Sequence, residues 1–196
     1  MALDKRLIKE LLIIGKKIDR CGLVIGEGGN ISAKSGWVVY IKRRNASMAA
    51  AKAADYIPVD ANTGKPFNAK NEPSTEVPMH IACYKSRKDI GAVIHTHPLF
   101  ITALGISKIN FKSLAYEAKI YLKSDIVVIP YVKPGSAALG RAVGRAVKKH
   151  NAIILKNHGL ITVGKDIREA FLRTLAAERA ALIYVSCKMI SKLDRL

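Results

Sequence analysis

Apolar side chains recur every three or four residues near both ends of the chain, which is the spacing of an amphipathic helix. One such helix is predicted over residues 3–20, with Gly22 as its C-terminal stop. Another is predicted to begin after Asp166, its N-cap, and to extend to about Cys187. The apolar positions that define the first helix are Leu3, Leu7, Leu11, Ile14 and Ile18.

Between these helices, short apolar runs rich in β-branched residues predict strands. The predicted strands cover residues 36–41, 56–59, 92–97, 125–130, 152–156 and 160–163. Further helices are predicted over residues 49–54, 75–84, 99–104 and 136–150, the second of them capped by Ser74 or Thr75. No internal repeat, low-complexity tract or linker interrupts this pattern, so residues 1–196 are expected to form one domain.

A pair of histidines stands at the end of one predicted strand. His95 and His97 are two residues apart and therefore share one face of that strand, which Pro98 ends. A zinc site that keeps a position open for substrate takes about three protein ligands, and His158, which follows the apolar run 152–155, is a candidate third. The alternative is that the pair consists of two hydrogen-bonded histidines that share a strand end by chance.

A glycine-rich stretch precedes the first predicted strand. Gly26, Gly28 and Gly29 can take positive φ angles, and the exposed N–H groups of such a loop suit an anion. The stretch is neither a Walker loop nor a dinucleotide-binding loop, and a tight hairpin connection explains it as well. The basic cluster at residues 42–47 is either a solvated loop or a cationic contact for a phosphate.

Three more residues could take part in a site. Glu76 lies in the first turn of the helix predicted at 75–84, where it either complements the helix dipole at the surface or faces the histidine pair. His80, one turn further on, is interpreted as a packing or hydrogen-bonding histidine. His150 closes a cationic helix end and is interpreted as a surface residue.

The charge balance is strongly basic, with 33 Lys and Arg against 15 Asp and Glu and a net charge of +18. Basic charge can indicate nucleic-acid binding. Here the charges are spread along the chain, without zinc-finger spacing or an RNA-binding signature, so no nucleic-acid partner is expected. A basic protein also attracts anionic metabolites, and sugar phosphates are the obvious class.

The sequence favours a cytoplasmic protein. No segment approaches the roughly 18 consecutive apolar residues of a membrane span, and the N-terminus lacks the features of a signal peptide. Cys21, Cys83 and Cys187 are odd in number and far apart, which favours free buried thiols in a reducing compartment.

Four short motifs, taken in this order and separation, resemble those of the class II aldolase/adducin family, and most closely its zinc-dependent L-fuculose-phosphate aldolases. The motifs are Gly-Gly-Asn-Ile-Ser at 28–32, Ser-Thr-Glu at 74–76 with His80, His-Thr-His at 95–97 and Asn-His-Gly-Leu at 157–160. The resemblance covers nearly the whole chain and implies a three-layer α/β/α domain with a mixed, largely antiparallel central sheet. It also implies a homotetramer with its site at a subunit interface.

The same resemblance implies a role for each matching residue. It makes His95, His97 and His158 the ligands of one Zn²⁺ per subunit, and Glu76 a catalytic carboxylate that can also bind the resting metal. It makes Tyr116 the residue that exchanges a proton with the aldehyde-side oxygen. The implied phosphate contacts are Gly29, Asn30, Ser74 and Thr75. The implied reaction is the reversible cleavage of a ketose 1-phosphate to dihydroxyacetone phosphate and an aldehyde.

The chain departs from the family pattern in two places that bear on substrate. The loop at 42–45 lacks the usual Thr/Ser-Gly turn, so Asn45 is expected to take a left-handed conformation while Lys42 or Arg43 supplies charge to the phosphate. Because the sequence stops at Leu196, no long C-terminal tail is expected to close over the aldehyde.

Other activities known on this fold remain open alternatives. Sugar-phosphate 4-epimerases usually carry Asp where this chain has Glu76, which argues against that activity. Methylthioribulose-phosphate dehydratases keep a Glu there, so Glu76 does not separate them from aldolases. Adducin-like domains have lost the metal-binding histidines, whereas all three remain here.

Overall fold

The computed structural model describes residues 4–107, 111 and 115–193 of the chain. Leu3, the first residue of the predicted N-terminal helix, therefore lies outside the described residues. A seven-stranded sheet forms the centre, in the order β3-β2-β1-β4-β7-β6-β5. All neighbouring strands are antiparallel except β5 and β6, which are parallel. The strands are β1 (Asn30–Ser35), β2 (Val38–Lys42), β3 (Tyr56–Asp60), β4 (Ala92–Thr96), β5 (Val127–Ile129), β6 (Ala152–Leu155) and β7 (Gly159–Gly164).

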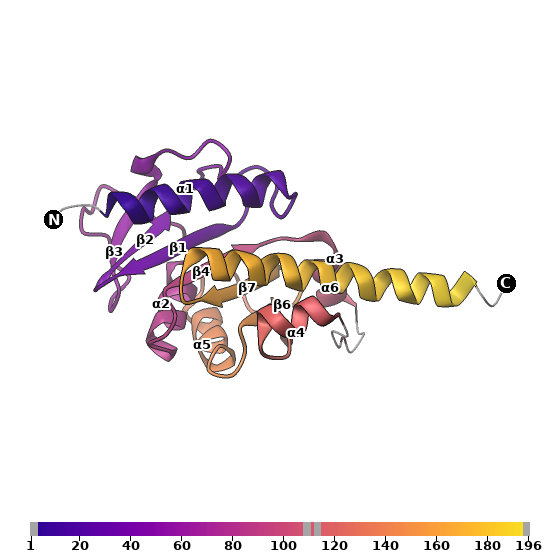
Figure 1. Cartoon of the computed structure of the whole chain (residues 1–196). Helices are drawn as coiled ribbons and strands as arrows, with labels where there is room; N and C mark the ends of the chain where they lie inside the picture. The colour runs from indigo at the N-terminus through magenta and orange to yellow at the C-terminus, as the bar shows by residue number, and fades with distance from the viewer. Residues whose placement is uncertain (1–3, 108–110, 112–114, 194–196) are drawn as a thin grey trace.

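Helices cover both faces of the sheet, as Figure 1 shows. Helices α2 and α5 pack on one face, and α1, α3, α4 and α6 pack on the other. The helices are α1 (Lys5–Arg20), α2 (Val77–Ser86), α3 (Leu99–Ile106), α4 (Tyr116–Leu122), α5 (Ala137–Ala146) and α6 (Ile167–Leu193), with a short 3₁₀ turn, η1 (Ala53–Asp55). This is the expected three-layer α/β/α fold with a mixed, largely antiparallel sheet.

Successive side chains of the central strand β4 point to opposite faces of the sheet and so contribute to the hydrophobic clusters of both helical layers. Val93 points into the cluster beneath α2 and α5, whereas Ala92 and Ile94 point into the cluster beneath α1. All three side chains are fully buried, so neither face of β4 can carry solvated polar groups. The buried strand therefore continues directly into the histidine pair that the sequence places at its end.

The terminal helices follow their predicted pattern. Asp4 caps α1 by accepting a hydrogen bond from the Leu7 backbone N–H at 3.0 Å. The side chains of Ile8, Leu11, Ile14 and Ile18 in α1 are buried. Helix α6 extends beyond the sheet in Figure 1, and its last part exposes Met189 and Ile190. Among the described helices, none is both long and apolar enough to cross a bilayer.

Several local expectations were wrong. Residues 49–52 are not helical, because Met48 and Ala51 are buried against α1 and hold this segment as an irregular loop before η1. The glycine-rich stretch runs directly into a strand, β1, that the sequence did not predict. Glu76, rather than Ser74 or Thr75, occupies the N-cap position of α2, and its side chain makes no capping hydrogen bond.

The burial of the cysteines and of His150 was predicted only in part. The three cysteines are free, but only Cys83 is buried, while Cys21 and Cys187 are exposed. His150 is half-buried just after α5, where its Nδ1 bonds the carbonyl oxygen of Asp125 at 3.0 Å. It does not belong to the group formed by His95, His97 and His158.

Candidate metal centre

Three histidines lie close together where β4 ends and the neighbouring strand β7 begins. His95 lies on β4 and His97 just beyond its end, while His158 lies in the turn between β6 and β7. The His95 Nε2 atom is 3.0 Å from His97 Nε2 and 3.2 Å from His158 Nε2. The antiparallel pairing of β4 with β7 produces this meeting, because it aligns the end of one strand with the start of the other. The sequence prediction that these three rings lie together is therefore confirmed by the geometry.

The donor atoms fit a divalent transition metal. A tetrahedral ion with ligand nitrogens at about 2.0–2.1 Å holds those nitrogens roughly 3.3–3.4 Å apart, close to the separations found here. His95 Nδ1 donates to the carbonyl oxygen of Leu160 at 2.9 Å, which leaves the Nε2 lone pair free to face the cluster. Such converging lone pairs repel one another unless a cation or proton lies between them.

The surroundings keep these imidazoles neutral, which is the form that binds a metal. Burial, together with the neighbouring imidazoles, lowers the pKa of His95 well below its usual value of 6.5. Burial also lowers the pKa of His97 and, against an opposing effect of Glu76, the pKa of His158. Neutral ligands would leave the full charge of a bound ion available to a substrate.

The Glu76 carboxylate lies beside the three rings. Its Oε2 atom is 3.2 Å from His95 Nε2, and its Oε1 atom is 3.6 Å from His158 Nε2. The side chain is 7% exposed, and Oε1 has no hydrogen-bond partner among the described residues. Of the two interpretations of Glu76 from the sequence, the structure favours the one in which it faces the histidines.

A buried chain of hydrogen bonds leads from Glu76 into the core between α2 and β1. Asn30 Nδ2 bonds Glu76 Oε2 at 2.8 Å, and Asn30 Oδ1 is in close contact with His80 Nε2. His80 Nδ1 then bonds Ser32 Oγ at 2.7 Å, which bonds the Tyr84 hydroxyl at 2.7 Å. His80 is thus a hydrogen-bonding histidine, as interpreted from the sequence.

The glycine-rich loop packs against the histidine pair. Gly29 has a φ of +64°, and a Cβ atom there would lie 2.6 Å from the carbonyl oxygen of His95. A Cβ atom on Gly28 would lie 3.2 Å from His97 Nδ1. Larger residues would push the loop away from the site, so the glycines are needed for close approach as well as for backbone conformation.

A hollow of about 330 Å³ opens beside the histidines. Its lining contains the four implied phosphate contacts, Gly29, Asn30, Ser74 and Thr75, and also Lys42 and Asn45 from the loop that departs from the family pattern. Asn45 has the expected left-handed conformation, with a φ of 55°. Arg43 and Arg44 also border the hollow, although Arg43 makes an ion pair of 3.3 Å with Asp55. The basic residues Arg43 and Arg44 and the polar residues Ser74 and Thr75 therefore border one hollow, together with the carboxylates of Glu27 and Glu76.

Lys42 has a structural role that the sequence did not show. Its side chain is only 2% exposed, and Nζ donates to the carbonyl oxygens of Glu27, at 2.8 Å, and of Ala46. Burial lowers the pKa of this ammonium group. Lys42 therefore ties the glycine-rich loop to the loop that follows β2, so that both border the hollow.

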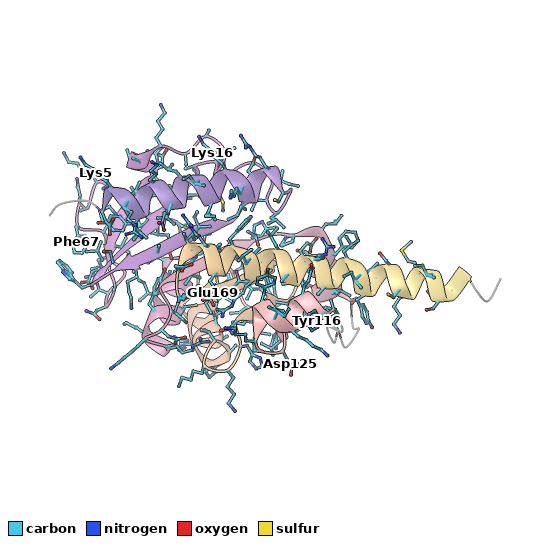
Figure 2. The ribbon with its side chains drawn as sticks, in the orientation of Figure 1. Lys5, Lys16, Phe67, Tyr116, Asp125 and Glu169 are labelled. Carbon is cyan, nitrogen blue, oxygen red and sulfur yellow. The ribbon has the colours of Figure 1, made fainter. Side chains whose placement is uncertain are left out.

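Tyr116 is not brought into the hollow of its own chain. It is the first residue of α4 and is 77% exposed (Figure 2). It does not belong to the residues that line the hollow. The single chain therefore does not bring Tyr116 together with the other predicted site residues.

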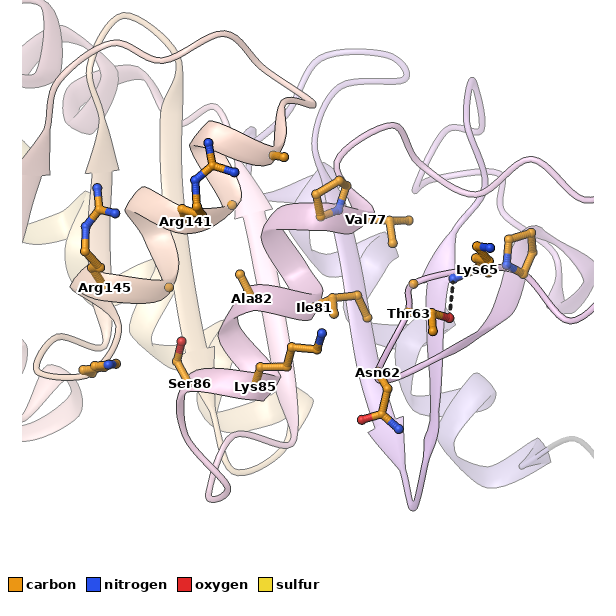
Figure 3. Close-up of a pocket in the computed structure, with 17 residues that line it drawn as sticks. Asn62, Thr63, Lys65, Val77, Ile81, Ala82, Lys85, Ser86, Arg141 and Arg145 are labelled. Atoms are coloured by element: carbon orange, nitrogen blue, oxygen red, sulfur yellow. Dashed lines mark hydrogen bonds between the residues drawn. The ribbon is translucent and has the colours of Figure 1, made fainter.

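A second hollow, of about 720 Å³, lies between α2, α5 and the turn after β3 (Figure 3). Its floor includes Val77, Ile81 and Ala82, and basic side chains such as Lys85 and Arg141 stand at its edge. The described residues that line it include no carboxylate, imidazole or thiol. Of these two hollows, only the smaller one is bordered by imidazole and carboxylate groups that could hold a metal.

The fold and site define the class of the protein. The family model of the Class II Aldolase and Adducin N-terminal domain matches residues 9–185. The match covers most of the chain, and the chain therefore belongs to this family.

Two similar proteins and one similar solved structure are aldolases that act on sugar phosphates, according to their names. The chain is 34% identical over 158 residues to a protein named L-fuculose phosphate aldolase from Methanococcus maripaludis, covering 81% of this chain and 84% of that protein. It is 26% identical to the 5-methylthioribulose-1-phosphate/5-deoxyribulose-1-phosphate aldolase of Escherichia coli, covering 93% and 84% of the two chains. A solved structure of an L-fuculose 1-phosphate aldolase superposes with a TM-score of 0.89 at 27% identity, covering 96% of this chain and 89% of that one.

Proposed function

We propose that the protein is a zinc-dependent aldolase. It cleaves a ketose 1-phosphate, such as L-fuculose 1-phosphate, to dihydroxyacetone phosphate and a short aldehyde resembling lactaldehyde. The observation that carries this proposal is the convergence of His95, His97 and His158 with Glu76 alongside. Family membership and the relatives named L-fuculose phosphate aldolase support it.

The three imidazoles would hold one Zn²⁺ per subunit. Their neutral state and the Nε2 separations of 3.0 and 3.2 Å support this assignment. When bound, the ion supplies Lewis-acid stabilisation of negative charge that develops on substrate oxygens. Glu76 lies close enough to bind the resting ion as well.

Glu76 would act as the general acid and base. Breaking the C3–C4 bond of the ketose leaves an electron pair on C3, and Glu76 delivers a proton there to complete dihydroxyacetone phosphate. In the synthetic direction the same carboxylate removes that proton. Asn30 holds Oε2, so Oε1, which has no partner among the described residues, is the oxygen that would exchange the proton.

The phosphate would bind at the other end of the hollow. Backbone N–H groups of the loop at Gly29 and the hydroxyl groups of Ser74 and Thr75, just before α2, border it. Arg44 adds charge where the family pattern has a hydroxyl and a glycine. Fixing the phosphate there would hold the reacting carbon against Glu76 and the metal ligands.

Tyr116 would complete the site of a neighbouring subunit in a homotetramer. It would exchange a proton with the C4 oxygen, which becomes the aldehyde oxygen. Its 77% exposure and its absence from the described lining of its own hollow support this placement. The three free cysteines support a reducing location such as the cytoplasm.

A second candidate substrate is 5-methylthioribulose 1-phosphate or 5-deoxyribulose 1-phosphate, named for the Escherichia coli relative. Both candidates release dihydroxyacetone phosphate and differ only in the aldehyde, so the groups around Glu76 suit either. The experiment is a product analysis with both ketose phosphates, with and without a chelator. Release of dihydroxyacetone phosphate that needs the metal supports an aldolase. Formation of an epimerised pentulose, or loss of water, would instead indicate an epimerase or a dehydratase.

A further inference from the structure

The hydrogen-bond chain behind Glu76 has a defined direction. The carboxylate of Glu76 can only accept, so the Asn30 group beside it is the donating amide nitrogen. The other atom of that amide, Oδ1, can only accept, so His80 Nε2 must carry a hydrogen and donate to it. The orientation of the Asn30 amide is therefore set from both sides.

The donors and acceptors at the other end of this hydrogen-bond chain, from His80 to Tyr84, can be assigned in the same way. His80 is fully buried, and this burial lowers its pKa to about 3, so the ring is neutral and its Nδ1 lone pair is free. Ser32 then donates its hydroxyl hydrogen to Nδ1, and Tyr84 donates to Ser32 Oγ. In each of these four hydrogen bonds, the donor lies on the Tyr84 side and the acceptor on the Glu76 side.

We propose that His80 is a positioning residue for the general acid and base, because it locks the Asn30 amide in the one orientation that holds Glu76 Oε2. This inference rests on the proposed aldolase function. It also assigns the Asn30 side chain a role at the carboxylate, in addition to the phosphate contact implied by its family motif.

The physical reason is the cost of the alternative orientation. Without the donor on His80, the Asn30 amide can turn over and place Oδ1 against the Glu76 carboxylate, which replaces an attractive contact of 2.8 Å by a repulsive one. Glu76 would then lose the bond that holds Oε2 and leaves Oε1 as the oxygen without a hydrogen-bond partner among the described residues. Asn30 and His80 are 4% and 0% exposed, so water is poorly placed to substitute for the missing donor.

The experiment measures the proton step by itself. Metal-loaded protein is incubated with dihydroxyacetone phosphate in deuterium oxide, and incorporation of deuterium at the hydroxymethyl carbon is followed by NMR without any aldehyde. This exchange requires Glu76 and does not require Tyr116. Wild-type protein that fails to exchange would refute the proposed function, whereas failure of the positioning role appears only in the variants.

The key variants differ in which hydrogen bond they keep. The side-chain amide of His80→Gln can reach the Nε2 position and donate to Asn30, whereas the shorter His80→Asn cannot. We expect His80→Asn and His80→Leu to slow exchange by about 10–100-fold, the scale on which an outer-shell partner acts, with metal content and KM nearly unchanged. We expect His80→Gln to retain most of the rate.

Tyr84→Phe is the matched control. It removes the last hydroxyl of the chain but leaves both bonds of Asn30, so its exchange rate should stay within about threefold of wild type, the effect of one remote neutral hydrogen bond. Equal rates for the Gln and Asn variants, or a loss in Tyr84→Phe as large as that in His80→Leu, would overturn the proposal. If His80→Leu fails to fold, the comparison of Gln with Asn still decides it.

Discussion

Replacing Gly29 by alanine tests whether the glycine-rich loop depends on close approach to β4, the strand that carries His95. Gly29 has a φ of +64°, and the added Cβ would lie 2.6 Å from the His95 carbonyl oxygen and 2.8 Å from a methyl group of Val24. Both separations are well inside van der Waals contact. The change therefore strains the backbone and also displaces either the loop or β4.

The size of the effect follows from these two terms. The left-handed conformation costs an alanine about 1 kcal/mol, and a forced backbone shift adds roughly 2 kcal/mol. The sum of about 3 kcal/mol corresponds to a fall in melting temperature of roughly 6–12 °C for a chain of this length. Activity and metal affinity should also decrease, because His95 moves with its carbonyl group.

Gly36→Ala is the control for backbone strain alone. Gly36 has nearly the same φ, +59°, but a Cβ there meets no atom within 4 Å. Its melting temperature should fall by only about 2–4 °C, the effect of roughly 1 kcal/mol, and its metal content should not change. Differential scanning calorimetry and metal analysis of both variants give the comparison. Equal falls in the two melting temperatures would refute the argument from close approach.

Three further predictions concern Glu76, Tyr116 and His80. Glu76→Gln should keep the metal but lose roughly 10²–10⁴-fold in turnover, the scale of a lost general base, and nearly unchanged turnover would contradict the assigned role. Tyr116→Phe should slow aldol cleavage yet leave deuterium exchange into dihydroxyacetone phosphate intact, while Tyr121→Phe on the same helix should affect neither. Burial lowers the pKa of His80 from 6.5 to about 3, so below pH 6.5 the unfolded chain binds a proton that the folded chain excludes. Stability should therefore fall by about 2 kcal/mol between pH 7 and pH 5 through this residue, and denaturant titrations should show that His80→Gln lacks this contribution.

The histidine cluster was predictable from the sequence because it depends on local rules. Alternation along a strand places His95 and His97 on one face, and Pro98 marks the strand end. His158 follows a second apolar run in the same way. The sequence placed Glu76 at the start of a helix but did not decide its role. A carboxylate in that position gives the same sequence pattern whether it lies at the surface or faces a site.

The features that the sequence did not predict depend on contacts between residues that are far apart in the sequence. The Asn30 side chain meets His80 across 50 positions of sequence, so no spacing rule gives this pairing. Lys42 looks like a loop cation, and only the fold shows that its ammonium group is buried against two carbonyl oxygens. The alanine-rich segment 49–54 favours a helix by propensity, but burial of Met48 and Ala51 against α1 overrides it.

Anomalous diffraction at the zinc edge, from crystals of protein purified without chelators and supplied with zinc, tests the central claim most directly. We predict one peak per subunit, about 2.0–2.1 Å from the Nε2 atoms of His95, His97 and His158, with a Glu76 oxygen or a water as the fourth neighbour. The peak should vanish in His158→Ala. A zinc ion bound elsewhere, or none at the three histidines, would contradict the account.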